Sequence, residues 1–448
     1  MATAKMLPES LSLLQTRLAE ARRETDGMFA LLREGALDER PIPERHRLIF
    51  YLGHVEAFDW NLFGSGAFEL PSFHPEFDKL FAFGIDPVDG KLPNEPASAW
   101  PKPEEVRKYN ARVREKIDAA LGAPSEKLPR LIADGTLLNV AIEHRLMHAE
   151  TLAYLFHQLA YEKKKLAGIE LRGKSEDSGR ANGLALQRMS GIPAGEATLG
   201  MRRENGDDFG WDNEFEEHRV QVPEFCIRAF PVTNGEFLEF VRCGGYEEKS
   251  LWSAEGWEWK NAAGISHPHF WAKNGERWEY SGMCARIPLP LDWPVYVSHA
   301  EASAFARWMN QSLPTEAQWH RAAYGALDGE ERQFPWGDEA PDVERGNFNF
   351  HHWDATPVGA HPGGRSAFDA QDLLGNGWEW TTTPFEAFPR FEPFPFYPGY
   401  SANFFDGKHF VMKGGSSRTA ACMLRRSFRN WFQPHYPYVY AKFRTVEA

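Results

Sequence analysis

Two histidines four residues apart carry the clearest chemical signal in the chain. His144 and His148 lie in the segment 143–150, which contains no proline and is expected to be helical. Side chains four residues apart project from one face of a helix, so both imidazoles can bind the same metal ion. Two histidines inside a helical bundle can equally be hydrogen-bonded core groups, and the spacing alone favours neither interpretation.

His54, on a second predicted helix, is a third candidate ligand, although a single histidine is more often a buried structural group. Three imidazoles without a carboxylate or thiolate suit iron(II), copper or zinc and leave coordination positions open. His157 lies nine residues after His148, about 180° around the helix, so we do not expect it to bind the same ion. His46 and His74 are expected on the surface or in loops.

Four long helices are expected to position these histidines. Apolar residues at helical spacing predict helices over residues 10–32, 43–63, from 103 onward and over 131–161. The stretch 68–102 is rich in proline, glycine and aspartate, which predicts a long ordered loop. Four helices with one long crossover predict a four-helix bundle over residues 1–165.

The texture of the sequence changes after the bundle. Residues 166–184 are polar and charged, and we interpret them as a domain linker. Over residues 185–448, glycine, proline, tryptophan and asparagine interrupt short alternating runs, and only two helices are expected, near 234–241 and 299–311. Long loops with few elements predict an α+β domain whose loops carry a site. The chain is therefore expected to be multidomain, with an α domain followed by an α+β domain.

The composition argues against several classes of function. The 448 residues are 42% hydrophobic and 25% charged, as in folded proteins. A net charge of −13 without a Lys/Arg block argues against nucleic-acid binding. No run reaches the roughly 20 apolar residues of a membrane span, and the N-terminal residues lack the apolar core of a signal peptide. Four scattered cysteines without a CxxC pair fit reduced thiols in the cytoplasm. The sequence does not indicate an oligomeric state.

A series of short motifs runs through the second half of the chain. In order, they occupy residues 231–237, 294–298, 313–319, 335–338, 374–380, 413–416 and 442–444. As an ordered set they resemble the formylglycine-generating-enzyme/sulfatase-modifying-factor fold, which is a C-type-lectin-like scaffold. The oxygen-dependent formylglycine generators place two copper-binding cysteines shortly after the Gly-Gly-Ser, where this chain has Thr419 and Leu424. Sulfatase activation is therefore not expected.

The N-terminal half resembles the DinB-like helical bundle, and the two domains together resemble the ergothioneine-biosynthesis sulfoxide synthases, the EgtB family. The resemblance covers nearly the whole chain. It implies one iron(II) at the domain interface, bound by the histidine of a Gly-His motif and by both histidines of a His-x-x-x-His motif, which here are His54, His144 and His148. It also implies a substrate pocket formed by the second domain, and it leaves open whether calcium binds there as well.

The resemblance places the substrate face near a Tyr-x-x-Tyr and a later Asn-Trp. In this chain these residues are Tyr397, Tyr400, Asn430 and Trp431. The resemblance implies that the first of them is the catalytic tyrosine and that the other three contact the organic substrate. A shift of one residue in the comparison would put Phe396 in the catalytic place.

Three departures from the family pattern bear on the thiol substrate. Relatives that use γ-glutamylcysteine have a Gln where this chain has Met147, an Arg where it has Asp78, and an Asp where it has Phe432. The Arg and the Asp are expected to bind the glutamyl end through charge-assisted contacts. Their loss favours free cysteine, with Met147, Ala82 and Phe432 as substrate contacts. Arg425, Arg426 and Arg429 are the candidate partners of the cysteine carboxylate.

The resemblance therefore implies a non-haem iron(II), O2-dependent sulfoxide synthase. Such an enzyme joins cysteine to C2 of the imidazole of hercynine and oxidises the sulfur. Its partners would be these small molecules and O2, with neither nucleic acid nor a membrane. An ovothiol-type 5-histidylcysteine sulfoxide synthase and a non-catalytic lectin-like ligand-binding module are the alternatives.

Overall fold

The computed structural model describes residues 11–82, 96–124, 127–165, 187–203 and 209–447. The chain divides into two compact units, the first within residues 1–169 and 206–209 and the second within residues 170–205 and 210–448. The predicted linker over residues 166–184 lies outside the described residues. None of the described helices combines the length and the apolar character that crossing a membrane requires.

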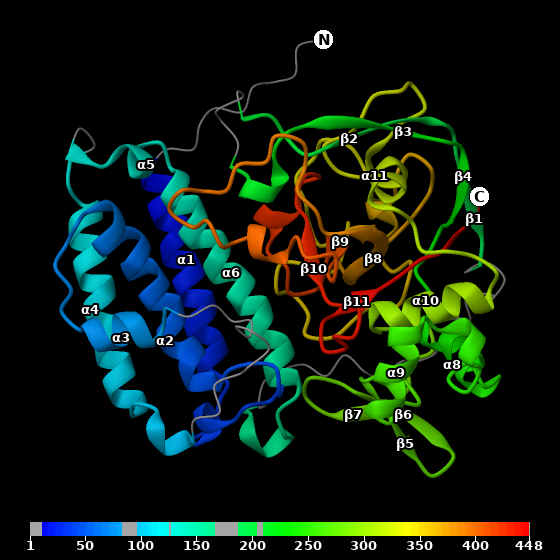
Figure 1. Cartoon of the computed structure of the whole chain (residues 1–448), viewed down its shortest axis with the longest axis horizontal. Coiled ribbons are helices and arrows are strands. Elements are labelled where there is room, and N and C mark those ends of the chain that lie inside the picture. The colour runs from blue at the N-terminus through cyan, green and yellow to red at the C-terminus, as the bar shows by residue number, and fades with distance from the viewer. Residues whose placement is uncertain (1–10, 83–95, 125–126, 166–186, 204–208, 448) are drawn as a thin grey trace. The chain divides into compact units, whose positions relative to one another are not determined.

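Helices make up the first unit (Figure 1). The long ones are α1 (Leu11–Ala30), α2 (Leu48–Asp59), α4 (Pro103–Leu121) and α6 (Thr136–His157). The short ones are η1 (Ala36–Asp38), the π-helical η2 (Trp60–Ala67), α3 (Pro75–Leu80), η3 (Ala97–Ala99), α5 (Arg130–Ala133) and η5 (Tyr161–Lys163). Helix α1 packs along α6, and α2 packs against both α4 and α6. The long helices thus form the bundle that the sequence predicts.

The extent of burial differs between these helices, and it is greatest in α2 and α6, which carry His54, His144 and His148. Helix α4 buries a single stripe at helical spacing, Val106, Tyr109, Val113, Ile117 and Leu121. Helices α2 and α6 bury residues around most of their circumference, which is the pattern of helices inside a bundle. Polar side chains on α2 and α6 are therefore held in the interior.

The second helix begins later than the sequence predicts. It starts at Leu48 and not at residue 43. A turn precedes it, in which the Arg45 N–H donates to the Ile42 carbonyl at 3.0 Å and the Ile42 side chain is completely buried. Burial of that isoleucine favours the turn over a further helical turn.

The stretch 68–102 is also not the uninterrupted loop that its prolines predict. It contains α3, where His74 Nδ1 accepts the Phe77 N–H at 3.4 Å and Pro75 occupies the first turn. A helix of six residues is too short to display an amphipathic repeat. Its sequence therefore looks like a loop.

The second unit combines short strands with short helices. The strands are β1 (Met189–Ile192), β2 (Gly195–Leu199), β3 (His218–Val222), β4 (Phe225–Arg228), β5 (Trp271–Asn274), β6 (Arg277–Ser281), β7 (Arg286–Pro288), β8 (Gly377–Pro384), β9 (Phe410–Gly415), β10 (Asn430–Phe432), β11 (Ala441–Lys442) and β12 (Val446–Glu447). The α-helices are α8 (Asn234–Arg242), α9 (Ala254–Ala262), α10 (His299–Trp308) and α11 (Glu316–Tyr324). The short helical turns are η7 (Asp212–Glu214), η8 (Lys249–Leu251), η9 (Pro362–Gly364), η10 (Ala402–Phe404) and η11 (Ala421–Met423).

The strands form small sheets with the orders β1-β4-β12, β10-β9-β8-β11, β2-β3 and β5-β6-β7. All described pairs are antiparallel except β11 with β8, which pairs Lys442 with Glu379. Three of the sequence motifs meet beside that pairing, since Glu379 accepts from Arg444 and from the Trp319 indole, each at 2.7 Å. These motif residues are therefore part of the buried framework.

Two helices of this unit, α9 and α11, are missing from the sequence prediction. Helix α9 buries only Gly256 and Lys260, so it shows no clear apolar face. Helix α11 begins with a capping box formed by Thr315 and Gln318, a signal that can also occur in a turn. The two helices that the sequence predicts, α8 and α10, are present.

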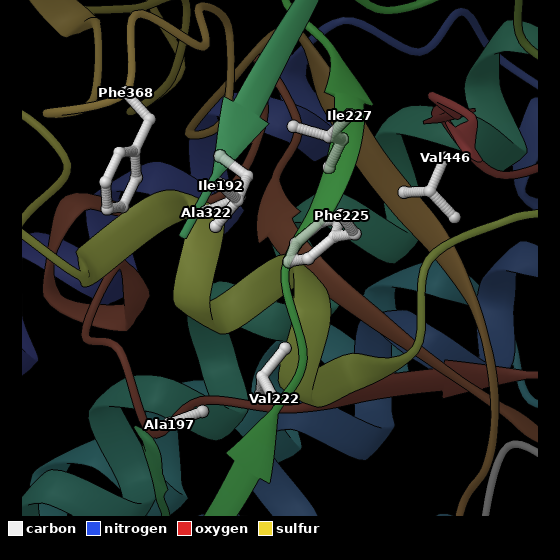
Figure 2. Close-up of a cluster of buried hydrophobic side chains, with 8 residues drawn as sticks. All are labelled: Ile192, Ala197, Val222, Phe225, Ile227, Ala322, Phe368 and Val446. Atoms are coloured by element: carbon white, nitrogen blue, oxygen red, sulfur yellow. The ribbon is translucent and has the colours of Figure 1, made fainter. Parts of the chain in front are cut away.

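One apolar core of the second unit joins its first and last strands. Figure 2 shows eight buried side chains that come from β1 to β4, from α11, from β12 and from a loop. They are Ile192, Ala197, Val222, Phe225, Ile227, Ala322, Phe368 and Val446. Strand β12 pairs with β4 and contributes Val446 to this core, so the last described strand packs beside the first strands of the unit.

Candidate metal centre and substrate-binding residues

The three predicted ligands come together inside the first unit. His54 on α2 and His144 and His148 on α6 are each at most 5% exposed. One ligand atom from each ring lies within 4.8 Å of the others, and no other group of three His, Cys, Asp or Glu is this close among the described residues. Imidazole nitrogens bind metals at about 2.1 Å, so a small contraction of this triangle would place all three around one ion.

The protonation of the three rings fits a metal ligand set. Burial lowers the pKa of His54 to about 4, although its bond to the Phe81 carbonyl acts in the opposite direction. Burial and the neighbouring imidazoles lower the pKa of both His144 and His148 well below the usual value. All three imidazoles are therefore neutral near pH 7, as metal binding requires.

The hydrogen bonding of the three rings also leaves nitrogen atoms that can bind an ion. Nδ1 of His144 and Nδ1 of His148 are buried and make no hydrogen bond within the described residues. A buried polar atom without a hydrogen-bond partner costs folding free energy. Two such atoms in neighbouring imidazoles are therefore a reason to consider a bound ion. His54 Nδ1 lies 2.6 Å from the Phe81 carbonyl oxygen. Because a carbonyl only accepts, Nδ1 carries the hydrogen, and Nε2 has its lone pair available for a metal.

A buried ionic network supports the two helices that carry the ligands. Arg145, between the two α6 histidines, donates to Glu56 at 2.9 and 3.0 Å and to Asp59 at 2.5 Å. All three side chains are fully buried. Burial alone would raise the pKa of Glu56, but Arg145 and Arg114 more than offset it and lower the pKa to about 2. The network therefore joins α6 to α2 beside the histidines.

Replacing Arg145 by Met is expected to destabilise the first unit strongly. The change leaves the Glu56 and Asp59 carboxylates buried without their main partner, and breaking a buried pair from one side costs about 3–5 kcal/mol. The matched control is Arg112→Met, because Arg112 pairs with Glu115 at 2.7 Å on the exposed surface of α4. The control should shift the free energy of unfolding by less than about 1 kcal/mol. Denaturant unfolding of metal-free protein measures both, and equal effects would contradict the prediction.

Aromatic rings surround the predicted substrate residues of the second unit. Tyr400 stacks on Trp211 with ring centroids 4.0 Å apart, and its ring meets Trp431 at 5.5 Å. Trp431 stacks on Phe385 at 4.1 Å, and Tyr397 lies 5.5 Å from Tyr400. We call these five residues the aromatic cluster. Tyr397, Tyr400 and Trp431 are half-buried.

Three further predicted residues, Asn430, Phe396 and Phe432, contact side chains or backbone next to them in the second unit. Asn430 lies on β10, where its Oδ1 accepts the Trp431 N–H at 2.9 Å. This contact leaves the Nδ2 end of the amide as its hydrogen-bond donor. Phe396, the alternative to Tyr397, stacks on Phe394 at 4.9 Å. Phe432 stacks on Tyr436 at 5.3 Å.

The three arginines considered for the thiol carboxylate already have acidic partners. Arg426 Nη1 donates to Glu331 Oε2 at 3.0 Å. Arg425 and Arg429 each hold a buried glutamate through two contacts of 2.5 to 3.2 Å. A role for Arg426 in binding the thiol therefore stays a prediction, and it would require the arginine to share its charge with Glu331.

The remaining predicted contacts lie in the first unit. Met147 is half-buried on α6, and Ala82 is exposed after α3. Asp78 is hydrogen-bonded within the unit: its carboxylate accepts from the Trp60 indole at 3.0 Å and from the Tyr109 hydroxyl at 2.7 Å. Its negative charge is therefore used to hold α3 in place.

The sequence interpretation missed two features of the metal centre. His46 is not on the surface: it is 4% exposed and stacks on Phe50, which in turn stacks on His54. The Phe81 carbonyl that orients His54 was not predicted either. The glycine at position 53, in the interior of a predicted helix, is the signal that could have indicated a close approach there.

Comparisons with known proteins agree with this architecture. The DinB superfamily matches residues 17–152, and the Sulfatase-modifying factor enzyme 1-like domain matches residues 174–448. The hercynine oxygenase of Mycolicibacterium thermoresistibile is 34% identical over 86% of this chain and 84% of that protein. The hercynine oxygenase of Mycobacterium tuberculosis is 41% identical over 52% of this chain and 55% of that protein. Ergothioneine biosynthesis protein 1 of Neurospora crassa is 29% identical over 93% of this chain, which spans only 55% of the fungal protein.

The matches confirm the predicted fold class, with a DinB helical domain followed by a C-type-lectin-like domain of the sulfatase-modifying-factor type. A relative that is 34% identical across most of both chains also establishes the family. The chain therefore belongs to the hercynine oxygenase family of ergothioneine biosynthesis and is an oxidoreductase.

Proposed function

We propose that this enzyme is a non-haem iron(II), O2-dependent sulfoxide synthase that joins cysteine to C2 of the hercynine imidazole. The observation that carries the proposal is the group of three buried, neutral imidazoles, His54, His144 and His148, in a chain related to hercynine oxygenases. When bound by these residues, iron(II) would supply the redox chemistry that lets O2 react with a thiol and an imidazole.

The proposed reaction balances with O2 as the only oxidant. The S–H bond of cysteine and the C2–H bond of the imidazole break, and a C–S bond and an S–O bond form. Forming the C–S bond removes two electrons, and oxidising the sulfur removes two more. These four electrons reduce O2, so one oxygen atom enters the sulfoxide and the other leaves as water.

The aromatic cluster would bind the trimethylammonium group of hercynine. Aromatic faces attract a quaternary ammonium by about 1–2 kcal/mol when water is excluded. Tyr400 and Trp431 are half-buried, and their rings meet with centroids 5.5 Å apart. Asn430, whose Oδ1 is held by the Trp431 N–H at 2.9 Å, would donate through Nδ2 to the hercynine carboxylate.

Tyr397 would act as the proton donor. Its ring lies 5.5 Å from Tyr400, at the edge of the aromatic cluster. Its hydroxyl would supply the proton with which the second oxygen atom leaves as water. A positioned donor of this kind favours C–S bond formation over oxidation of cysteine alone.

Product analysis tests the proposal most directly. The protein is incubated aerobically with iron(II), hercynine and either cysteine or γ-glutamylcysteine, and the products are identified by mass spectrometry. We expect the cysteine sulfoxide of hercynine together with uptake of O2. Attachment at another ring carbon of histidine would favour the ovothiol-type reaction, and ligand binding without O2 uptake would favour a lectin-like module.

We predict that cysteine is strongly preferred over γ-glutamylcysteine. Position 78 carries no guanidinium and position 432 no carboxylate, so the two charged ends of the glutamyl group lack partners there. Each missing charge-assisted contact costs roughly 1–3 kcal/mol, and two together correspond to about a hundredfold or more in kcat/KM. Because Asp78 is engaged with Trp60 and Tyr109, the discrimination rests on missing attraction and not on repulsion.

Measuring kcat/KM for both thiols checks this preference. Phe432→Asp should increase the use of γ-glutamylcysteine relative to cysteine, because the new carboxylate can bind its ammonium group. Phe432→Leu is the matched control, since it also removes the stacking on Tyr436 but adds no charge. Comparable values for the two thiols in the unmodified enzyme would contradict the prediction.

A further inference from the structure

Helix α3 connects a structural anchor to one of the three histidines of the metal centre. The helix spans Pro75–Leu80, and Phe81 follows it as the C-cap, with its N–H bonded to the Phe77 carbonyl at 3.0 Å. The Phe81 carbonyl lies 2.6 Å from His54 Nδ1. We infer that α3 is a positioning element for His54, with Asp78 as its anchor; the inference rests on the proposed metal site.

The Phe81 carbonyl sets both the tautomer and the direction of the His54 ring. It accepts the Nδ1 hydrogen and so directs the Nε2 lone pair to the side facing His144 and His148. The Nδ1 atoms of the other two histidines have no such partner within the described residues. His54 is therefore the ligand whose orientation depends on a segment outside its own helix.

Gly53 allows the contact to form. A Cβ atom at this position would lie 2.6 Å from three carbons of the Phe81 ring, which is fully buried. Carbon atoms do not approach this closely, so any larger residue must displace the ring and with it the Phe81 carbonyl. Glycine in the interior of α2 costs roughly 1 kcal/mol of helix stability relative to alanine, and the close approach of Phe81 gives it a structural purpose.

Asp78 holds α3 against the rest of the unit. Its Oδ1 accepts from the Tyr109 hydroxyl of α4 at 2.7 Å, and its Oδ2 accepts from the Trp60 indole of η2 at 3.0 Å and from the Ser72 hydroxyl at 2.5 Å. A helix of six residues is unstable without tertiary contacts. The Asp78 carboxylate therefore holds the Phe81 carbonyl in position together with the packing of the Phe81 ring against Phe50 and Tyr109.

Loss of a carbonyl or carboxylate that orients a metal-binding histidine typically weakens metal binding by about 10–100-fold. We expect Gly53→Ala and Asp78→Ala to show this effect while His54, His144 and His148 are all kept. Gly53→Ala displaces the Phe81 ring directly. Asp78→Ala removes the bonds of α3 to Tyr109 and Trp60 and changes no residue of α2. The two variants therefore disturb the same carbonyl by independent routes.

Two matched controls separate this effect from a general loss of stability. Gly27→Ala makes the same chemical change inside α1, where a Cβ would meet nothing within 4 Å. Asp118→Ala removes an aspartate of α4 that pairs with Arg22 at 2.7 Å. Neither residue contacts the histidines, so both controls should bind metal as the unmodified protein does.

The measurement is the affinity for iron(II) and for cobalt(II), by anaerobic competition with a chromophoric chelator on the full chain. The visible absorption of the cobalt form and the NMR signal of the His54 Nδ1 hydrogen report the ligand geometry, and circular dichroism reports folding. We expect both variants to bind each metal 10–100-fold more weakly, with helicity kept, the cobalt spectrum altered and the Nδ1 hydrogen exchanging faster.

Metal affinity equal to that of the unmodified protein in folded Gly53→Ala or folded Asp78→Ala would overturn the inference and leave the proposed function intact. If Asp78→Ala does not fold, Gly53→Ala decides the question alone. An unmodified protein that binds neither metal would instead overturn the proposed metal site, and this inference with it.

Discussion

Replacing His148 by Ala is expected to abolish stoichiometric binding of iron(II), and turnover with it, while the bundle stays folded. Only two imidazoles of the group would remain, which is too few to hold iron(II) against solvent. The Nδ1 atom of His148 makes no hydrogen bond within the described residues, so its removal breaks no such bond. Loss of the buried ring leaves a cavity that costs roughly 2–4 kcal/mol.

Metal analysis after anaerobic reconstitution, with circular dichroism on the same sample, tests this prediction. His157→Ala is the matched control, because His157 lies on the same helix and is 7% exposed. It is outside the group of three, so the control should keep the metal and the activity. If His148→Ala retained one iron per chain, the proposed ligand set would be wrong.

Tyr397→Phe is expected to divert the enzyme from sulfoxide synthesis to oxidation of cysteine alone. The variant keeps the ring that lies 5.5 Å from Tyr400, so binding of hercynine should change little. Without the hydroxyl proton, both atoms of O2 would go to the sulfur and give cysteine sulfinate. Loss of a positioned proton donor typically costs 10²–10⁴-fold, so sulfoxide formation should fall by about a hundredfold or more.

The ratio of sulfoxide to sulfinate, measured by mass spectrometry, is the relevant readout for Tyr397. Tyr400→Phe is the matched control, because it removes a hydroxyl from the same cluster and keeps the stacking on Trp211 at 4.0 Å. The control should still make mainly sulfoxide. A normal rate of sulfoxide formation by Tyr397→Phe would assign the proton donor to another residue.

The sequence alone determined those parts of the protein that depend on local spacing. His144 and His148 are four residues apart on a helix without proline, so their common face follows from helix geometry alone. The long helices of the bundle have clear apolar spacing, and two of the four, α1 and α4, start close to where this spacing predicts, whereas α2 and α6 each start five residues later. The ordered motifs of the second half identified its fold, because as a set they resemble those of a known scaffold.

The tertiary structure decided what depends on residues far apart in the chain. The bond between His54 and the Phe81 carbonyl spans 27 residues, and that between Arg145 and Glu56 spans 89. Asp78 appeared to be a substrate-facing residue, but it anchors α3 through Trp60 and Tyr109.

Burial and ion pairing also depended on residues far apart in the chain. His46 is polar and was therefore expected on the surface or in a loop, yet the fold buries it against Phe50. Arg426 is paired with Glu331, a residue 95 positions away. A sequence pattern records the periodicity of one element, whereas burial and pairing arise only when elements meet. The placement of His144 and His148 on one face of α6 could therefore be predicted from the sequence, but the Phe81 carbonyl beside His54 and the ionic network around Arg145 could not.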